Sequence, residues 1–286
     1  SSTAGQRRFV NDSERFLEIY ETLRGVCEAN PLRRLGISPH SLRAVMPELL
    51  KTVLNGIADD VRAHIHVAEQ TKEVEDCLAW SGKRPVEFLL DQFDVSSRWC
   101  AIHATHMTAG ETQRLAKSGA IAGLCPTTEA NLGDGIFPAD SFMKQGGAIA
   151  IGSDSQITIS PAEDLRMLEY SQRLRDRTRN ALASGAGAST GRSLLDAVLK
   201  GGAACLDQPM GAIAVGRRCD IAVLDVGHPA MIGRMGDAAL DTWIFSAGNA
   251  AVKDVIVGGS HVVMDRRHVN EDRIQKKFAE TVRRLS

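Results

Sequence analysis

Apolar residues recur every three or four positions near the start of the chain, which is the spacing of one helix face. The first such segment covers residues 13–28 and is preceded by a serine or aspartate that can cap it. The same spacing returns further along, at residues 42–58, 71–91, 109–118, 139–145, 162–182 and 192–205. The pattern therefore predicts a series of amphipathic helices.

Short apolar runs of the kind that form buried strands lie between these helical segments. They cover residues 35–38, 61–67, 99–103, 120–125 and 148–152. Strands that alternate with helices at this spacing form a parallel sheet with right-handed crossovers. Apolar residues on both faces of several runs indicate helices on the outside and a filled core inside. The fold class expected from this pattern is α/β.

Polar residues stand at the C-terminal ends of several different strands. A (β/α)8 barrel gathers such residues around one end, whereas a doubly wound sheet concentrates them at one switch point. The pattern therefore favours a TIM barrel, of which five strands are predicted in this chain.

The pattern of apolar residues changes after Leu206. Short alternating strands separated by glycine turns are expected within residues 211–225 and 252–264, and a charged helix from Asn270 to the end. We therefore expect three parts: a (β/α) barrel portion over residues 1–207, a small β domain over 208–267 and a C-terminal helix over 268–286.

Composition narrows the possible functions. The chain has 286 residues, 43% of them hydrophobic, which is enough for a substantial buried core. Its 34 Lys and Arg and 35 Asp and Glu give a formal charge of −1, so neither nucleic acid nor an anionic membrane surface is an expected partner. No apolar stretch reaches the roughly 18 residues that span a bilayer. The six cysteines form no CxxC pair and are expected to be buried thiols of a protein in a reducing cytoplasm.

Candidate chemistry lies at the ends of three predicted strands. The runs are VRAHIH at 61–66, WCAIH at 99–103 and AIAIGSD at 148–154. The first ends on His66 with Glu69 three residues later, the second ends on His103, and the third ends on Asp154. A histidine beside a carboxylate can supply a metal ligand and a proton shuttle, and three such ends in register indicate a metal-dependent hydrolase.

On these residues the chain resembles the amidohydrolase superfamily. In that superfamily a metal-binding histidine follows strand five, another histidine follows strand six and an aspartate follows strand eight. If residues 35–38 are strand four, the runs at 61–67, 99–103, 120–124 and 148–152 become strands five to eight. Residues 211–225 also resemble the β-sandwich that accompanies that barrel. Four segments further resemble the formimidoylglutamate deiminase subgroup: GQRRF at 5–9, SPHSLR at 38–43, HIHVAEQ at 64–70 and CPTTEANLGDGIF at 125–137.

The resemblance implies a role for each of these residues in hydrolysing N-formimino-L-glutamate to N-formyl-L-glutamate and ammonia, a step of histidine degradation. His66 and Asp154 would ligate one divalent metal, expected to be zinc. Asp154 would also accept the proton of the attacking water, His103 would orient that water, and Glu69 would protonate the departing nitrogen. A homodimer is expected as well.

His40 and Arg43 follow strand four, where the resembled subgroup binds substrate. A planar guanidinium can hold a carboxylate through two parallel hydrogen bonds, so Arg43 predicts a small acidic substrate. Without the resemblance, Arg43 could equally be an exposed cation near a helix start, and His40 a capping histidine. Glu129, Asn131 and Asp134 could line the pocket or only cap and turn the chain, and His106 is expected to be a loop residue.

His64 and His66 together imitate the HxH pair that the superfamily carries on its first strand. Too few strands follow to assign this run as strand one, so His64 is expected inside the barrel in a structural role. Without the true HxH pair, only His66 and Asp154 remain as ligands, fewer than the three usual at a catalytic zinc. We therefore expect an N-terminal portion beyond this sequence, and doubtful metal occupancy without it.

Two other functions remain open. A deaminase of the same superfamily that acts on a nucleobase or an aminotriazine would share His66, Glu69, His103 and Asp154 but would not need Arg43. A catalytically incompetent fragment that serves only for association would need none of these residues.

Overall fold

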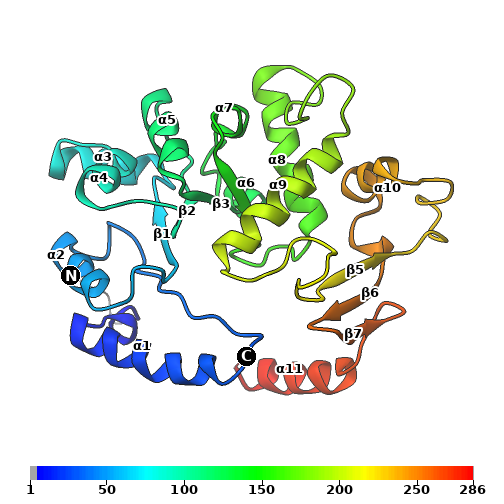
Figure 1. The fold of residues 1–286 in the computed structure, drawn as a ribbon, viewed down its shortest axis with the longest axis horizontal. Coiled ribbons are helices and arrows are strands. Elements are labelled where there is room, and N and C mark those ends of the chain that lie inside the picture. The colour runs from blue at the N-terminus through cyan, green and yellow to red at the C-terminus, as the bar shows by residue number, and fades with distance from the viewer. Residues whose placement is uncertain (1–4, 286) are drawn as a thin grey trace.

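Residues 5–285 are described by the computed structural model of the chain. Four parallel strands form its central sheet in the order in which they follow along the chain (Figure 1). They are β1 (Ala63–Val67), β2 (Trp99–His103), β3 (Ile121–Leu124) and β4 (Ala148–Ile151). These strands confirm four of the predicted runs, and because neighbouring strands run parallel, their polar ends emerge at one edge.

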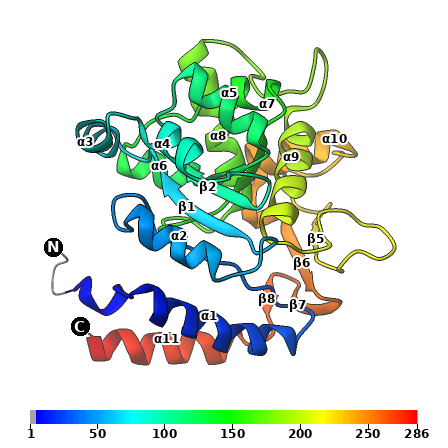
Figure 2. The same ribbon diagram turned by 60° about the vertical axis from the view of Figure 1, so that its left-hand side comes forward.

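Helices precede, connect and follow the strands of this sheet (Figures 1 and 2). They are α1 (Ser13–Glu28), α2 (Pro47–Asn55), α3 (Thr71–Ser81), α4 (Pro85–Gln92), α5 (Ala109–Ser118), α6 (Pro126–Leu132), α7 (Ala139–Lys144), α8 (Pro161–Asp176) and α9 (Thr190–Cys205), with a 3-10 turn η1 at Arg7–Phe9. Helix α9 approaches β4 so closely that a Cβ on Gly201 would lie 2.0 Å from the carbonyl oxygen of Ile149. Glycine at this position therefore sets the distance between helix and sheet.

A second sheet follows the helical part and is antiparallel throughout, with the order β5-β6-β7-β8. Its strands are β5 (Ile221–Leu224), β6 (Val252–Val257), β7 (Ser260–Met264) and β8 (Arg267–His268). The helical elements α10 (Asp237–Thr242), η2 (Trp243–Ala247) and η3 (Gly248–Ala251) lie between β5 and β6, and α11 (Glu271–Leu285) follows β8.

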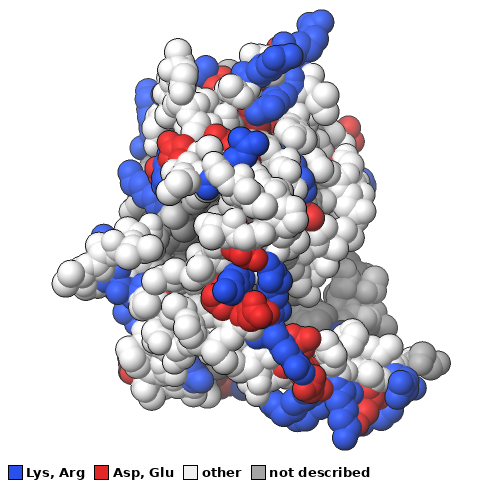
Figure 3. Space-filling view, turned by 90° about the vertical axis from the view of Figure 1, so that its right-hand side faces the viewer, with Lys and Arg blue, Asp and Glu red and all other residues white. Residues whose placement is uncertain are grey.

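On the face that Figure 3 shows, Lys and Arg side chains are interspersed with Asp and Glu rather than gathered in a field of one sign.

The strand predicted at residues 35–38 is wrong in extent. Only Ile37 makes a parallel bridge there, to Ala63, and a second isolated bridge joins Ser41 to His66. Pro39 lies between the two bridges and has no backbone N–H to donate, so a continuous ladder cannot form. The segment still covers the outer edge of β1.

Several helix limits also differ from the prediction. The helix predicted from residue 42 begins only at Pro47, because proline is favoured in the first turn and the residues before it form turns. Helix α8 ends at Asp176, where Arg177 adopts the left-handed conformation with φ 54°. Helix α6 and the helical elements between residues 237 and 251 were not predicted at all.

Burial of the cysteines matches the prediction only in part. Cys77, Cys100, Cys125 and Cys205 are buried, whereas Cys27 is half-buried and Cys219 is exposed. Over residues 5–285, no helix is both long enough and apolar enough to cross a membrane.

Candidate active site

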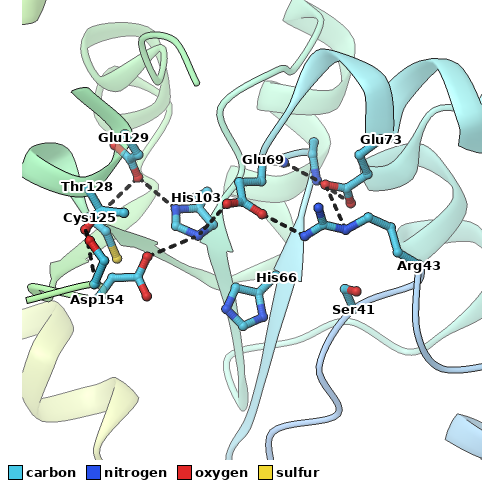
Figure 4. Close-up of polar contacts among 12 residues, drawn as sticks. Ser41, Arg43, His66, Glu69, Glu73, His103, Cys125, Thr128, Glu129 and Asp154 are labelled. Atoms are coloured by element: carbon cyan, nitrogen blue, oxygen red, sulfur yellow. Dashed lines mark hydrogen bonds and ion pairs between the residues drawn. The ribbon is translucent and has the colours of Figure 1, made fainter. Parts of the chain in front are cut away.

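The predicted site residues meet at the carboxyl edge of the parallel sheet (Figure 4). His66 lies near the end of β1, His103 is the last residue of β2, and Asp154 follows β4 after a short turn. The rings of His66 and His103 are 5.6 Å apart between centroids. Strand order alone therefore brings together residues that are distant in the sequence.

His103 is the most buried member of this group, with 1% of its surface exposed. Its Nε2 lies 3.9 Å from Glu69 Oε1 and also 3.9 Å from Asp154 Oδ2. Its Nδ1 lies 3.1 Å from Glu129 Oε1, and since a carboxylate only accepts, Nδ1 carries the proton in this hydrogen bond. Burial by itself lowers the pKa of His103, but the hydrogen bond and the surrounding carboxylates outweigh burial and raise it. The ring is thus fixed at one nitrogen and points the other toward two acids.

Glu129 is held as firmly as the histidine that it orients. Its Oε1 also accepts a 2.8 Å hydrogen bond from the backbone N–H of Cys125. Helix α6 begins at Pro126, directly after β3. Glu129 lies in the first turn of this helix and faces His103. The sequence left Glu129 as either a pocket residue or a cap, and the structure gives it contacts of both kinds.

Glu69 is positioned from two sides. Its Oε2 accepts a 2.7 Å hydrogen bond from Arg43 Nη2. Its backbone N–H donates to Glu73 Oε2 at 2.9 Å, and the neighbouring N–H of Ala68 donates to Glu73 Oε1 at 3.0 Å. The Glu73 side chain is only 1% exposed and lies 3.7 Å from Arg43 Nε. Sequence reasoning missed Glu73, because a glutamate in the first turn of a helix is ordinarily a surface residue that favours the helix dipole.

Asp154 lies on a constrained turn. Its φ is 51°, in the left-handed region that few non-glycine residues adopt, and Ala68, His103 and Ala104 of the same edge share this feature. Thr128 of α6 braces the turn: its hydroxyl donates to the carbonyl of Ser153 at 2.9 Å and accepts from the N–H of Ser155 at 3.2 Å. Residues held in sparsely populated conformations cluster at functional sites, which fits this edge of the sheet.

His66 has the hydrogen bonding of a metal-binding histidine. Its Nδ1 lies 2.7 Å from the carbonyl oxygen of His40, so Nδ1 donates and Nε2 is left with a free lone pair. His40 itself contacts the hydroxyl of Ser41 at 2.9 Å, and burial followed by the charges of His66 and Arg43 lowers the pKa of His40. A free imidazole nitrogen and the carboxylate of Asp154 are the donor types that zinc accepts. The residues present therefore fit part of a divalent metal site.

Other polar residues near this edge have structural partners. His106 Nε2 lies 2.7 Å from the carbonyl of Asp134, which tethers the loop after β2 to the loop after α6. Burial raises the pKa of Asp134. Asn131 is exposed to solvent. His64 lies two residues before His66, and its Nε2 is 3.1 Å from the carbonyl oxygen of Cys205.

Comparison with known proteins gives a consistent result. The model of the amidohydrolase family matches residues 11–262. Formimidoylglutamate deiminase of Pseudomonas aeruginosa is 51% identical over 284 residues, which cover 99% of this chain and 62% of that protein. A 5-methylthioadenosine/S-adenosylhomocysteine deaminase of Halobacterium salinarum is 33% identical over 194 residues, 67% of this chain and 44% of that protein.

Solved structures show the same fold. The crystal structure of an amidohydrolase from Brucella melitensis has a TM-score of 0.93 and 48% identity, covering 100% of this chain and 62% of that one. Atrazine chlorohydrolase of Arthrobacter aurescens, solved in complex with zinc, has a TM-score of 0.80 at 23% identity, covering 96% of this chain and 60% of that one. The chain thus spans about three fifths of the length of the relatives it matches over nearly all its residues.

Proposed function

Because this chain belongs to the amidohydrolase family, we propose that it carries the acid–base and substrate-binding residues of a metal-dependent deiminase. The substrate would be N-formimino-L-glutamate, and the products N-formyl-L-glutamate and ammonia. The observation that carries this proposal is the position of His103, whose Nε2 stands 3.9 Å from the carboxylates of both Glu69 and Asp154. The 51% identity to formimidoylglutamate deiminase of Pseudomonas aeruginosa supports this substrate.

His66 and Asp154 are the residues of this chain that would hold the metal, and zinc is the ion that we propose. When bound, such an ion lowers the pKa of a coordinated water toward neutrality. Two protein ligands are fewer than the three usual at a catalytic zinc, so these residues supply only part of the coordination.

The chain's own residues divide the proton transfers between them. Hydrolysis adds water to the formimino carbon and breaks its bond to the terminal nitrogen, which leaves as ammonia. Asp154 would accept both protons of the water, the first on attack and the second as the carbonyl forms, and Glu69 would deliver one proton to the terminal nitrogen for each of them. His103, held at Nδ1 by Glu129, would orient the water through Nε2. Both carboxylates lie 3.9 Å from the same His103 nitrogen, so the groups that would exchange these protons stand close together.

Arg43 and His40 are proposed to bind the substrate. The Arg43 side chain is 35% exposed and already contacts the carboxylates of Glu69 and Glu73, so it lies at the rim of the site with free donors. A substrate carboxylate would add a second ion pair to the same guanidinium. Arg43 would therefore place an acidic substrate directly beside the proton donor Glu69.

We also propose the finer architecture that the sequence predicts. In this proposal β1 to β4 correspond to barrel strands five to eight, and the part boundaries fall at residues 207/208 and 267/268. Assembly as a homodimer and a cytoplasmic location belong to the same proposal.

The test uses the complete gene product that contains this chain. We expect ammonia release from N-formimino-L-glutamate that is lost after chelation and restored by zinc. Activity on an adenine nucleoside or an aminotriazine, without activity on N-formimino-L-glutamate, would favour the rival deaminase. If no ammonia is released from any of these substrates in the presence of zinc, the enzymatic proposal fails.

Substitution of Arg43 separates its two possible roles. A hydrogen bond to a charged group is worth about 1.5–3 kcal/mol, so Arg43→Ala should lower kcat/KM for N-formimino-L-glutamate by about 10- to 100-fold. An N-formimino amino acid that lacks the side-chain carboxylate should be much less affected. Equal losses on both substrates would mean that Arg43 only positions Glu69. The matched control is Arg33→Ala, which removes an exposed cation outside the site.

A further inference from the structure

A second group of metal-binding side chains lies away from the residues described above. An imidazole nitrogen of His64 and the sulfur atoms of Cys100 and Cys205 all lie within 4.8 Å of one another. Cys100 is 1% exposed and Cys205 is 9% exposed, and His64 is half-buried. The only other such group among residues 5–285 is His103, Cys125 and Glu129, which belongs to the candidate active site.

The fold brings these three side chains together from distant segments. His64 of β1 and Cys100 of β2 are paired across the parallel ladder, so their side chains point to the same face of the sheet. Cys205 is the last residue of α9 and arrives from the other end of the parallel part, with its carbonyl 3.1 Å from His64 Nε2. His64 and Cys100 each lie three residues before the last residue of their strand, so the cluster is set back from the carboxyl edge.

Two glycines keep space open for the cluster. A Cβ on Gly123 of β3 would stand 2.8 Å from Cys100 Sγ, so any larger residue would displace that thiol. Gly201, whose Cβ would collide with Ile149, lets α9 come close enough for Cys205, one turn later, to reach the sheet. Ile121 and Ala150 pack around the two cysteines, so the thiols lie in an apolar and largely dry environment.

We propose that His64, Cys100 and Cys205 form a second metal site, for a thiophilic ion such as zinc, distinct from the metal site at the carboxyl edge. Ligands at about 2.0–2.3 Å from a tetrahedral zinc stand roughly 3.3–3.8 Å apart, so small side-chain movements suffice to close this triad on an ion. One histidine and two thiolates are a donor set of the kind found in zinc sites, and two thiolates balance the charge of a divalent ion. Water or an added ligand would complete the coordination.

A cavity lies next to the chain segments that carry His64 and Cys205. This cavity of about 710 Å³ is lined by Arg62, two residues before His64, and by Ala204, next to Cys205. Its basic lining is partly neutralised, because Asp207 pairs with Arg62 at 3.2 Å and with Arg34 at 3.8 Å.

The test uses cobalt as a spectroscopic probe in the protein stripped of metal. A cobalt ion bound by thiolates shows an intense charge-transfer absorption that a site of histidine and carboxylate does not. We expect this band in the wild-type protein, and we expect Cys100→Ser and Cys205→Ser each to abolish it and to weaken cobalt binding at this site at least tenfold. Cys77→Ser is the matched control, since Cys77 is also buried but lies on α3 outside both groups.

Each alternative outcome has a definite meaning. Absence of the band in the wild-type protein overturns the proposal, as does its persistence in either Cys100→Ser or Cys205→Ser. Loss of the band in Cys125→Ser alone would assign thiolate binding to the group with His103 and Glu129 instead.

A second measurement uses the wild-type protein alone, so its result does not depend on whether a variant folds. Zinc should slow alkylation of Cys100 and Cys205 in the wild-type protein, as measured by mass spectrometry, while the exposed Cys219 reacts at an unchanged rate. Equal labelling of Cys205 with and without zinc would contradict the site.

Discussion

His103 Nδ1 and Glu129 Oε1 are 3.1 Å apart, and this hydrogen bond joins the end of β2 to helix α6 beneath the candidate active site. The same carboxylate oxygen holds the N–H of Cys125, so Glu129 cannot swing away without breaking two contacts. The orientation of His103 is thus set by a residue 26 positions further along the chain. Glu129 is a positioning residue in this account.

Glu129→Gln should reduce turnover more than substrate binding. The amide oxygen of a glutamine can take the place of Oε1 and keep both contacts, but the substitution removes the negative charge that raises the pKa of His103. Changing such an outer partner typically costs about 10- to 100-fold in activity. We expect this loss in kcat with KM little changed, and a shift of the acidic limb of the pH profile to lower pH. Glu163→Gln on α8 is the control. A rise in KM with kcat unchanged would contradict the positioning role.

Glu73→Gln should destabilise the protein although it touches no substrate in this account. The Glu73 carboxylate accepts two backbone hydrogen bonds, from Ala68 and Glu69, and the amide of glutamine can accept only one of them. Leaving a buried donor unpaired costs about 1–3 kcal/mol in the free energy of unfolding. Urea unfolding measures this difference. Glu75→Gln, two residues later on the exposed side of α3, should change it by less than about 0.5 kcal/mol.

Two neighbouring glycines of α9 should respond in opposite directions to the same substitution. Gly201→Ala would place a methyl group 2.0 Å from the Ile149 carbonyl oxygen, whereas a Cβ on Gly202 meets nothing within 4 Å. Alanine in an open helix position stabilises by about 0.5–1 kcal/mol relative to glycine. Thermal unfolding should therefore show a higher Tm for Gly202→Ala and a clearly lower one for Gly201→Ala. A Tm for Gly201→Ala at or above wild type would mean that α9 and β4 are not packed as described.

Asp164 should make stability depend on pH in an unusual direction. Burial raises the pKa of Asp164 against the opposing hydrogen bonds from Thr127. The folded state therefore binds this proton more tightly than the unfolded state, so the free energy of unfolding falls as pH rises from the ordinary aspartate value through the raised one. Asp164→Asn keeps an acceptor for Thr127 and should remove this dependence. Unfolding free energies of the two proteins across the acidic range test it, and parallel curves would contradict it.

The sequence alone predicted the strands of the parallel sheet and the polar residues at their C-terminal ends. Apolar runs of five residues bounded by helical segments are a local signal, and His66, His103 and Asp154 follow from them because parallel strands end at one edge. The segment at residues 35–38 was predicted less well, since one proline converts a strand into two isolated bridges.

The residues that hold the site were identified only in part, because the sequence left Glu129 as either a pocket residue or a cap and missed Glu73. Glu73 and Glu129 both stand in first helical turns, where an acid normally faces solvent and favours the helix dipole. Their burial arises only from tertiary packing against Arg43 and His103. Likewise, nothing local links His64 to Cys205, which lie 141 positions apart.

In the proposed deiminase reaction, Glu69 delivers the proton to the departing nitrogen. Ammonia release from N-formimino-L-glutamate by Glu69→Gln, in the complete gene product loaded with zinc, tests it most directly. We expect a fall in kcat of about 10²- to 10⁴-fold, the range of general acid–base catalysis, with metal content unchanged and with Glu75→Gln as active as wild type. Turnover by Glu69→Gln at the wild-type rate would contradict it.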